Sequence, residues 1–578
     1  MNKIRNLFKL INLIGANKYY VSFLIILMLI SSALDLISLG LIAPYISSIF
    51  DLENNSATTF TSKFIMFNSI KTDDLILFFT IFLLIVFFLK AIFSIIIRWL
   101  ISLFAFKQYA KLQVKLMSAY QNMKYEDYIL RTTSEYIRNV RELCSDCLSN
   151  IDSMLRVISE VIIFVVIIIF LALLNFKILL FLFLIITPIF IIYEFILKPI
   201  NLKLGKEKVD AAKQMYKNID SGMRGLKEIR ILSRENFFTE KLAIFGSKIY
   251  RTQKISSLIS DSPRYVFEFF VVSSALIVFM ILSSKNLDFK NYLPALGVFL
   301  LAGLRLLPSL SLITSSLSRI GYVQYSVEKV CEDLEQYKEN KNKETKNEKN
   351  NKEFDSIKLE NFSFNYKNIN RKVFQNSDFS VSRNNCIGII GESGSGKTTL
   401  VDILLGLLNP TEGNIFFNNV LTKGSSKIFQ GEIAYLPQEP IILDEDIKTN
   451  VTLYSDKNKI DYNRLFDALK RANMKNVIDN LPKKLDTILG EDGIRLSGGQ
   501  NKRLALARAF YHGKNVVIMD EATSSLDIES ENYIAEQIRE LKGKFTIIII
   551  SHHMNILKYC DKIFKVENNK INLHKTTK

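Results

Sequence analysis

The sequence GESGSGKT at residues 391–398 decides the fold of the C-terminal half of this 578-residue chain. An apolar strand is predicted directly before it, at Cys386–Ile390, and a helix directly after it, at Thr399–Leu408. This order matches the G-x-x-x-x-G-K-[ST] pattern, in which backbone N–H groups and a helix N-terminus bind nucleotide phosphates. The pattern predicts an α/β P-loop domain that binds ATP with Mg²⁺.

The residue types of this loop define their expected contacts. Lys397 is expected to reach the β- and γ-phosphates, and the hydroxyl of Thr398 is expected to bind Mg²⁺. The remaining residues expected around the phosphates are Gly391, Ser393, Gly394, Ser395, Gly396 and Thr399.

A second apolar strand, predicted at residues 516–521, ends in two consecutive carboxylates, Asp520 and Glu521. We expect Asp520 to hold Mg²⁺ through its coordination shell. Glu521 would act as the general base for the attacking water, a role typically worth about 10²–10⁴ in rate. Taken alone, the pair could be a solvated strand end, but the P-loop favours the catalytic interpretation.

The N-terminal half contains six apolar segments long enough to cross a bilayer as helices. They are Tyr20–Ile49, Leu75–Phe104, Met154–Leu174, Phe176–Leu197, Tyr265–Leu282 and Leu293–Leu317. Counted in chain order, the five connections carry two, seven, one, fourteen and two Lys or Arg residues. The positive-inside rule therefore places 107–150, 198–263 and both termini in the cytoplasm. Membrane orientation also explains much of the net charge of +17, so a nucleic-acid partner is not expected.

The sequence outside the spans suggests four parts. Residues 1–18 are predicted to be an amphipathic helix on the inner leaflet rather than a signal peptide, because no small-residue cleavage site follows. Residues 19–330 would form the transmembrane domain, with cytoplasmic helical extensions at Tyr125–Arg141 and Glu207–Phe237. The charged stretch 331–354 is predicted to be a solvated linker or a helical hinge. Residues 355–578 would form the nucleotide-binding domain.

Further motifs in the C-terminal half resemble the nucleotide-binding domain of ABC transporters over nearly all of 357–570. The motifs are LSGGQ at 496–500, Gln438 in YLPQEP, SSLD at 524–527, and Ser551-His552 after a strand. The resemblance implies that Ser497, Gly498, Gly499 and Gln500 of one subunit contact the ATP of another. It implies that Gln438 senses Mg²⁺ and water, and that His552 contacts the γ-phosphate. His553 stands where Arg is more usual in the family.

The same resemblance implies an adenine contact and a subunit arrangement. Tyr366 is placed like the aromatic residue that stacks on adenine, although it could simply be a residue of a strand face. Gly490-Glu491 resembles the loop that senses the membrane domain. Because two facing ATP sites need two copies of each motif, a homodimer is expected. A membrane domain fused before the ATP-binding domain resembles the exporter and flippase type, in a bacterial inner membrane.

Cations within the predicted spans are candidate ligands for an anionic cargo. Arg305 lies in the middle of a span, where an arginine costs about 2.5–3.5 kcal/mol on insertion scales. Lys90, Arg98 and Arg264 are the other candidates. For Arg264, a salt bridge to Glu268 or snorkelling to the interface is the alternative. Cations lining a cavity would suit a pyrophosphate, which matches the planar arginine fork.

Three short segments carry a closer resemblance, SPRYVFE at 262–268, 293–310 and 225–238. They look like the lipid-linked oligosaccharide flippase of bacterial protein N-glycosylation. The resemblance implies a polyprenyl-pyrophosphate-linked glycan as cargo and an external helix in loop 50–74. An exporter of peptides, drugs or another lipid is the alternative, and a soluble ABC ATPase without transport is a third, disfavoured by the spans.

Overall fold

The computed structural model describes most of the chain. The described residues are 15, 17–41, 72–174, 176, 180, 187, 191, 193–284, 289–344, 353–366, 372–422, 433–454, 456–490, 493, 496–521 and 528–576. Most of the predicted interfacial helix, of the external loop and of the fourth predicted span lies outside this set, as do Glu491, Ser524–Asp527 and the side chain of Arg305.

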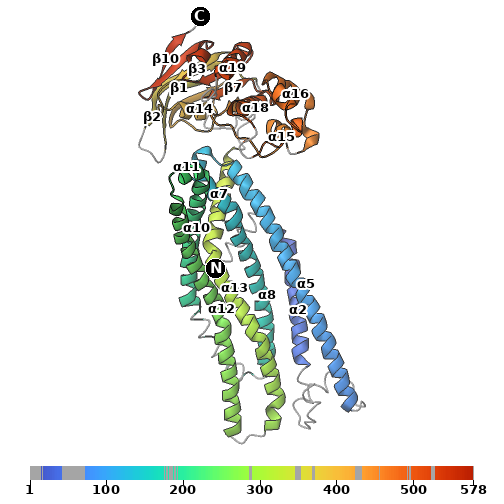
Figure 1. The fold of residues 1–578 in the computed structure, drawn as a ribbon. Coiled ribbons are helices and arrows are strands. Elements are labelled where there is room, and N and C mark those ends of the chain that lie inside the picture. Colours follow the sequence, from blue (N-terminus) through green and yellow to red (C-terminus); the bar gives the residue numbers. More distant parts are fainter. Residues whose placement is uncertain are drawn as a thin grey trace. The chain divides into compact units, whose positions relative to one another are not determined.

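The chain divides into two compact units. The first comprises residues 1–123 and 127–340, and the second comprises 124–126 and 341–578. The first unit is helical (Figure 1). The elements that lie wholly or partly in it are α2 (Lys18–Gly40), α5 (Thr72–Gln121), α6 (Tyr125–Tyr128), α7 (Thr133–Arg138), the π-helix η1 (Asn139–Leu143), α8 (Cys144–Leu174), the π-helix η2 (Tyr193–Leu197), α10 (Lys198–Arg224), α11 (Leu226–Ile231), α12 (Glu235–Ser284) and α13 (Phe289–Glu344).

Three helical stretches of the described part are long and apolar enough to cross a membrane. They are Tyr19–Ser38, Thr80–Gln121 and Thr133–Leu173, and they overlap the first three predicted spans. Helices α12 and α13 continue through the fifth and sixth predicted segments. Six spans therefore remain a proposal.

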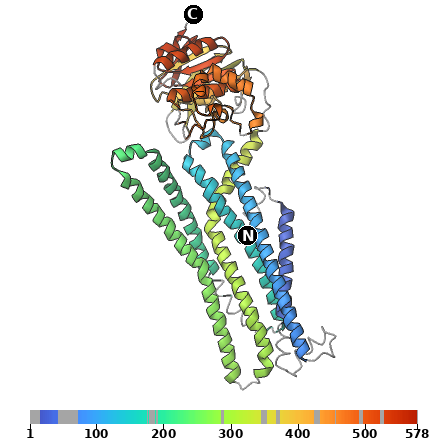
Figure 2. The ribbon, with the colours of Figure 1, turned by 45° about the vertical axis from the view of Figure 1, so that its right-hand side comes forward.

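Helices α2, α5 and α8 pack together around an apolar core. Its buried side chains include Leu24 and Met28 of α2, Ile97 of α5 and Ile151 of α8. Helices α10 and α12 run side by side as a long pair joined through α11 (Figure 2). Gly225 separates α10 from α11, which confirms the predicted helix, glycine turn and helix in Glu207–Phe237.

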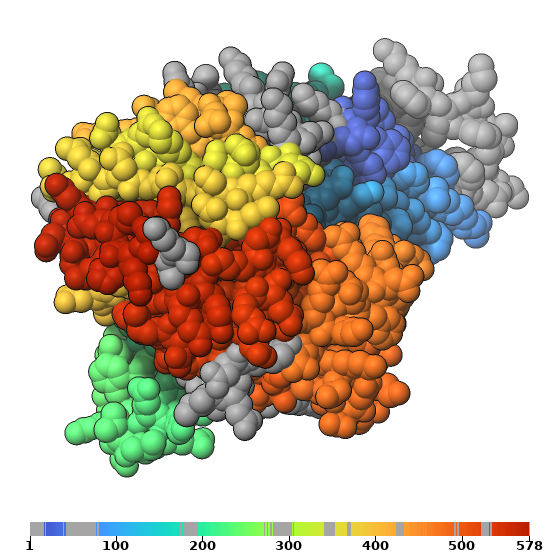
Figure 3. Space-filling model, turned by 90° about the horizontal axis from the view of Figure 1, so that it is seen from above, coloured from blue at the N-terminus to red at the C-terminus, as the bar shows by residue number. Residues whose placement is uncertain are grey.

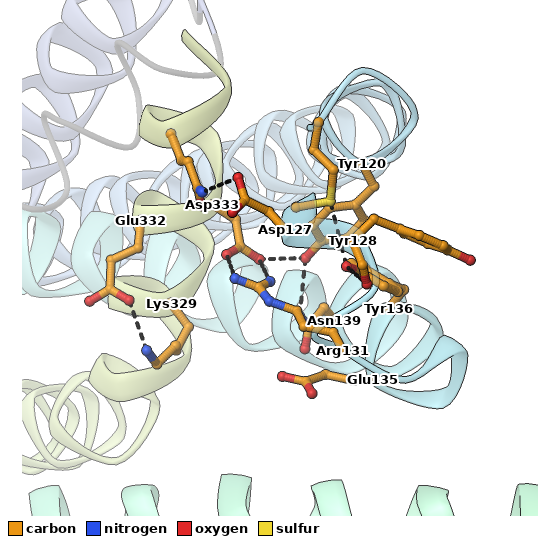
Figure 4. A network of polar contacts seen from close by, with 12 residues as sticks. Tyr120, Asp127, Tyr128, Arg131, Glu135, Tyr136, Asn139, Lys329, Glu332 and Asp333 are labelled. Atoms are coloured by element: carbon orange, nitrogen blue, oxygen red, sulfur yellow. Dashed lines mark hydrogen bonds and ion pairs between the residues drawn. The ribbon is translucent and has the colours of Figure 1, made fainter. Parts of the chain in front are cut away.

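A polar network joins the ends of three helices that are distant in sequence (Figure 4). The Tyr120 hydroxyl of α5 donates to Asp333 Oδ2 of α13 at 2.6 Å. The guanidinium of Arg131 forms two contacts of 3.0 Å with the same carboxylate. Asn139 of η1 donates to the Tyr120 oxygen at 3.0 Å. The network thus fixes the segment between α5 and α8 against α13.

A second buried network joins α8, α10 and α13. Lys208 Nζ of α10 lies 2.9 Å from Asp146 Oδ1 and 3.5 Å from Glu142 Oε1. Ser326 of α13 donates to Asp146 Oδ2 at 2.6 Å. Burial lowers the pKa of Lys208, but the charge of Asp146 outweighs it, so the pKa of this ammonium is raised overall. The lysine therefore stays charged while buried.

The second unit contains two sheets. An antiparallel sheet has the order β2-β1-β4-β5 and a mainly parallel sheet has the order β10-β9-β3-β8-β7-β6. Their strands are β1 (Ser356–Asn365), β2 (Lys372–Ser382), β3 (Cys386–Ile390), β4 (Glu412–Phe417), β5 (Val420–Leu421), β6 (Ile433–Leu436), β7 (Val516–Asp520), β8 (Thr546–Ile550), β9 (Lys562–Glu567) and β10 (Lys570–Thr576). Because β3 and β7 both flank β8 in parallel, the segments that follow these three strands meet at one edge.

Short helices surround these sheets. They are α14 (Lys397–Leu404), α15 (Ile447–Thr452), η4 (Lys457–Lys459), α16 (Tyr462–Arg471), α17 (Lys475–Asp479), η5 (Lys484–Asp486), α18 (Gly498–Tyr511), α19 (Ile528–Leu541) and α20 (Met554–Leu557). The two sheets meet where Gln375 N of β2 donates to Asn569 O at 2.9 Å. Figure 3 shows the yellow β1–β2 segment beside the red β9–β10 segment. The orange α15–α18 region lies at the lower right of the same view.

The charged stretch after residue 338 is partly helical. Helix α13 continues to Glu344, so the first residues of the stretch extend the last long helix, as the helical-hinge alternative requires. Residues 345–352 lie outside the description.

All five cysteines are buried, and none of them forms a disulfide bond within the part of the chain that the structure describes. Cys144 and Cys147 are in α8, and Cys331 is in α13. Cys386 and Cys560 lie in the second unit, with their sulfur atoms 3.6 Å apart.

Candidate nucleotide-binding site

The loop between β3 and α14 has a backbone that only glycine adopts easily. Gly394 and Gly396 have φ angles of +78° and +109°, in a region that side chains disfavour. A Cβ on Gly396 would also lie 2.8 Å from Val373 Cγ1. The loop therefore keeps its curved shape because glycines occupy these positions.

Two side chains of the loop are arranged for a phosphate. Lys397 is buried, and its Nζ donates to the carbonyl oxygens of Gly391 at 2.7 Å and Glu392 at 2.9 Å. The hydroxyl of Ser395 is buried and has no hydrogen-bond partner among the described residues. Such an orphaned donor is costly unless a ligand satisfies it. A phosphate oxygen fits both groups, while Thr398 is exposed beside them.

Tyr366 lies against the same helix. Its hydroxyl is 3.1 Å from Thr399 Oγ1, and its ring packs edge-on against Phe364 with centroids 4.9 Å apart. The structure therefore brings Tyr366 beside the P-loop, which the sequence alone could not decide.

Asp520 ends β7 and is buried next to two groups that sequence reasoning missed. The Tyr435 hydroxyl donates to Asp520 Oδ2 at 3.3 Å. Burial raises the pKa of Asp520. Burial, together with the charge of Asp520, raises the pKa of Asp402 to about 7. Asp402 follows Thr398 by four residues in α14, so i,i+4 spacing could have identified it. A divalent cation would relieve this crowding of carboxylates, and oxygen donors of this kind suit Mg²⁺.

Glu521 and the two histidines occupy distinct positions. Glu521 has a φ of +47°, and its N–H donates to Ile550 O of the neighbouring strand at 3.0 Å. His552 Nε2 lies 3.7 Å from Glu521 Oε1. His553 Nδ1 instead lies 3.2 Å from Glu531 Oε2 of α19. Of the two histidines, His552 is therefore the one beside the predicted base.

Gln438 and Lys502 complete this edge of the sheet. Gln438 is exposed in the segment after β6, the strand next to β7. Lys502 of α18 is buried, and burial lowers its pKa although Glu521 and Glu439 oppose the shift. Sequence reasoning did not predict Lys502 as a neighbour of Glu521.

The residues Ser497–Gln500 begin α18 as a capping box. Ser497 Oγ accepts from Gln500 N at 3.3 Å, and Gln500 Oε1 accepts from Ser497 N at 2.9 Å. A Cβ on Gly498 would meet nothing within 4 Å. In the described part of the chain, neither Ser497 nor Gln500 bonds to a P-loop residue. The helix start is thus ordered, with open space at Gly498.

The candidate cations of the membrane half have different surroundings. Lys90 forms an ion pair with the buried Asp35 of α2 and lies 5.3 Å from the centroid of the Phe87 ring. Arg98 binds Asp152 of α8 through both terminal nitrogens, at 2.9 and 3.4 Å. Arg264 is exposed on α12, and no ion pair joins it to Glu268 or to any other described residue. The side chain of Arg305 lies outside the description.

Comparisons with known proteins agree with this geometry. Residues 374–524 match the model of the family described as ABC transporter. The chain is 35% identical to the ATP-dependent lipid A-core flippase of Ralstonia nicotianae over 37% of this chain and 37% of that protein. It is 28% identical to the lactococcin-G-processing and transport ATP-binding protein LagD of Lactococcus lactis subsp. lactis over 66% of this chain and 54% of that protein. The first-matched flippases are thus spanned over little more than a third of their length.

A solved structure of a bacterial Atm1-family ABC exporter with ATP bound superposes with a TM-score of 0.74. The match covers 96% of this chain and 95% of that one at 16% identity. This likeness shows the fold: a helical membrane-type domain followed by an ABC nucleotide-binding domain. The fold class expected from the sequence is confirmed.

Proposed function

We propose that the chain is an ATP-driven exporter or flippase of the ABC type. The observation that carries the proposal is the buried Ser395 hydroxyl, which has no hydrogen-bond partner among the described residues. It lies beside Lys397, at the sheet edge that also holds Asp520 and Glu521. The long apolar helices of the first unit belong to the same chain. ATP hydrolysis would therefore be coupled to movement of a cargo across a membrane.

Each residue of the site has a proposed task. Lys397 would exchange its carbonyl partners for the β- and γ-phosphates, and Ser395 would donate to a phosphate oxygen. Thr398, Gln438 and Asp520 would hold Mg²⁺, which neutralises phosphate charge when bound. Glu521 would accept a proton from the attacking water, and His552 would contact the γ-phosphate. Tyr366 would stack on adenine.

A second copy of the chain would complete each site. Ser497, Gly498 and Gly499 lie at the start of α18, where the side chain of Ser497 makes no hydrogen bond to a P-loop residue in the described part of the chain. These three residues would contact ATP held by the partner. The turn between α10 and α12 exposes Met223, Ile231 and Leu232 in the predicted cytoplasmic region, at 71%, 74% and 68%. Exposed apolar groups of this kind mark interaction sites, and the partner would cover them. We propose a homodimer.

The proposed cargo is a lipid carrying phosphate, and specifically a polyprenyl-pyrophosphate-linked oligosaccharide in a bacterial inner membrane. The support is the resemblance of 225–238, 262–268 and 293–310, the candidate cations Arg264 and Arg305, and the similarity to a protein named as a lipid flippase. Lys90 and Arg98 would need to exchange their carboxylate partners in order to bind cargo. Peptide export is the second candidate, supported by the 28% identity to LagD over 66% of this chain.

Reconstitution in vesicles tests the proposal. The wild-type chain should hydrolyse ATP and move a lipid-linked oligosaccharide, whereas Glu521→Gln should bind ATP but lose about 10²–10⁴ in hydrolysis rate. Glu412→Gln, at an exposed carboxylate of β4, is the matched control and should leave both activities unchanged. Flipping that persists in Glu521→Gln would refute coupling to hydrolysis. Movement of a peptide but not of the lipid would favour the second candidate.

A further inference from the structure

We propose that Arg98, Asp152 and Arg156 form a binding site for the phosphate of a lipid head group in the cytoplasmic leaflet. Hereafter these three residues are called the arginine pair site. The inference rests on the proposed function only for the orientation of the chain in the membrane. Arg156 was not a candidate from the sequence, because the second arginine that shares its carboxylate, Arg98, lies on another helix.

Two guanidinium groups share one carboxylate at this site. Arg98 of α5 binds Asp152 of α8 through both terminal nitrogens. Arg156, one turn further along α8, places its Nε 3.1 Å from Asp152 Oδ2. That Nε is buried and makes no well-directed hydrogen bond to any described group. Two cations and one anion leave a net charge of +1, with guanidinium donors to spare.

The composition of this cluster differs from that of the more buried ion pairs. Lys90 meets Asp35, and Arg131 meets Asp333, each as one cation with one carboxylate. Lys208 meets two carboxylates. Among the ion pairs of the described residues, Asp152 is the carboxylate shared by two arginines. A purely structural ion pair needs only one of them, so the excess arginine requires another anion or water.

Exposure leaves room for that anion. The side chains of Arg98 and Arg156 are 44% and 39% exposed, whereas Asp152 is 23% exposed. On the same helix as Arg98, the apolar side chains of Ile95 and Trp99 are 69% and 62% exposed. The arginines therefore border an apolar surface, as a lipid-binding site at the membrane interface requires.

The position along the helices fits the head-group level. Arg98 lies six residues before Phe104, the cytoplasmic end of the second predicted span, which is about 9 Å along a helix. Arg156 lies two residues inside the third predicted span, or about 3 Å. Long basic side chains at this depth reach the interface. The planar fork of arginine binds phosphate oxygens in pairs, so a phosphate is the anion that this geometry suits.

Trp99 makes the site directly observable, because it is the single tryptophan of the chain and adjoins Arg98. The full-length protein would be reconstituted in phosphatidylcholine vesicles containing phosphatidylglycerol, with brominated acyl chains on one lipid or the other. We expect brominated phosphatidylglycerol to quench Trp99 more strongly than brominated phosphatidylcholine at the same mole fraction. The ratio of the two gives the preference for the anionic lipid.

Substitutions should move this ratio in opposite directions. Arg156→Gln keeps the Arg98–Asp152 pair and should lower the preference about fivefold, the effect of about 1 kcal/mol per basic side chain at an anionic surface. Arg98→Gln with Arg156→Gln should remove the preference. Asp152→Asn frees both arginines and should raise it. Arg224→Gln, which breaks the exposed pair with Asp220 on α10, is the control and should leave the ratio unchanged.

Competitors separate the sources of phosphate. Relief of quenching by polyprenyl pyrophosphate at a mole fraction where unlabelled phosphatidylglycerol has no effect would assign the site to the cargo lipid. Relief in simple proportion to phosphatidylglycerol would assign it to bulk phospholipid. Soluble pyrophosphate that relieves quenching as well as either lipid would overturn the lipid assignment.

A structural role alone predicts different results. In that case Asp152→Asn would lower the unfolding temperature without raising the preference for the anionic lipid, and Arg156→Gln would leave the quenching ratio at the wild-type value. Either result overturns the inference. ATP binding, measured with a fluorescent nucleotide on the same vesicles, reports separately on the proposed ATPase, so failure of one is distinguishable from failure of the other.

Discussion

Tyr120 donates a 2.6 Å hydrogen bond to Asp333 although 213 residues separate them. Because the acceptor is a carboxylate shared with Arg131, this bond is charge-assisted. Tyr120→Phe should lower the stability of the first unit by about 1.5–3 kcal/mol, measured as the unfolding temperature in detergent. Tyr250→Phe, at an exposed ring on α12, should change little. Equal effects of the two substitutions would show that the network in Figure 4 does not stabilise the fold.

The two adjacent histidines should have separable effects. His552→Ala removes the side chain 3.7 Å from Glu521 and should lower the rate of ATP hydrolysis by about 10² or more. His553→Ala leaves the buried Glu531 without its 3.2 Å partner, which should cost about 1–3 kcal/mol of stability and retain most of the hydrolysis. Steady-state ATPase and unfolding assays on both variants check this. A larger loss of hydrolysis in His553→Ala would reverse the assignment.

The nucleotide-free second unit should become less stable as the pH rises from about 4 to 7. The pKa of Asp402 is about 7 in the folded chain and near 3.8 otherwise, so the folded state binds this proton more tightly. The resulting stability is present at low pH and is lost as the pH rises through 7. The pKa of Asp520 is raised as well, so this carboxyl group contributes in the same direction. Unfolding temperatures measured without Mg²⁺ at pH 5 and pH 8 test this. Between these two pH values the unfolding temperature of Asp402→Asn should fall less than that of the wild type. An unchanged pH dependence in that variant would contradict it.

Close packing of α10 on α13 should make Gly205 intolerant of a side chain. A Cβ at this position would lie 1.9 Å from the Tyr322 carbonyl oxygen, and backbone atoms cannot move aside as a side chain does. Gly205→Ala should destabilise the first unit by about 1–3 kcal/mol, measured by thermal unfolding. The control is Gly246→Ala in α12, where a Cβ meets nothing within 4 Å. That variant should be neutral or slightly stabilising, because alanine favours helices.

The parts of the molecule that were predictable from sequence depend on short-range patterns. The P-loop at 391–398 and the strand predicted at residues 516–521 were recognisable because their residues are contiguous. The structure confirms both elements, with the strand ending one residue earlier, at Asp520. The helix of the linker region was left open, because lysine, glutamate and asparagine suit both a solvated coil and an exposed helix.

The environment of isolated charges was not predictable in the same way. Lys90 pairs with Asp35 and Arg98 pairs with Asp152, each more than 50 residues away in the sequence. A local sequence pattern therefore could not predict the partner of either cation. The proximity of Lys502 to Glu521 was unpredictable for the same reason, because α18 and β7 are brought together only by the fold. The roles of Arg264 and Arg305 stay predictions.

The burial of all five native thiols has a practical consequence for studying motion. Single cysteines placed at exposed sites, such as Glu412 on β4 or Tyr250 on α12, should react with maleimide spin labels or dyes while the wild-type cysteines stay silent. Distances between label pairs could then be followed through a nucleotide cycle in native lipid, without first constructing a cysteine-free background.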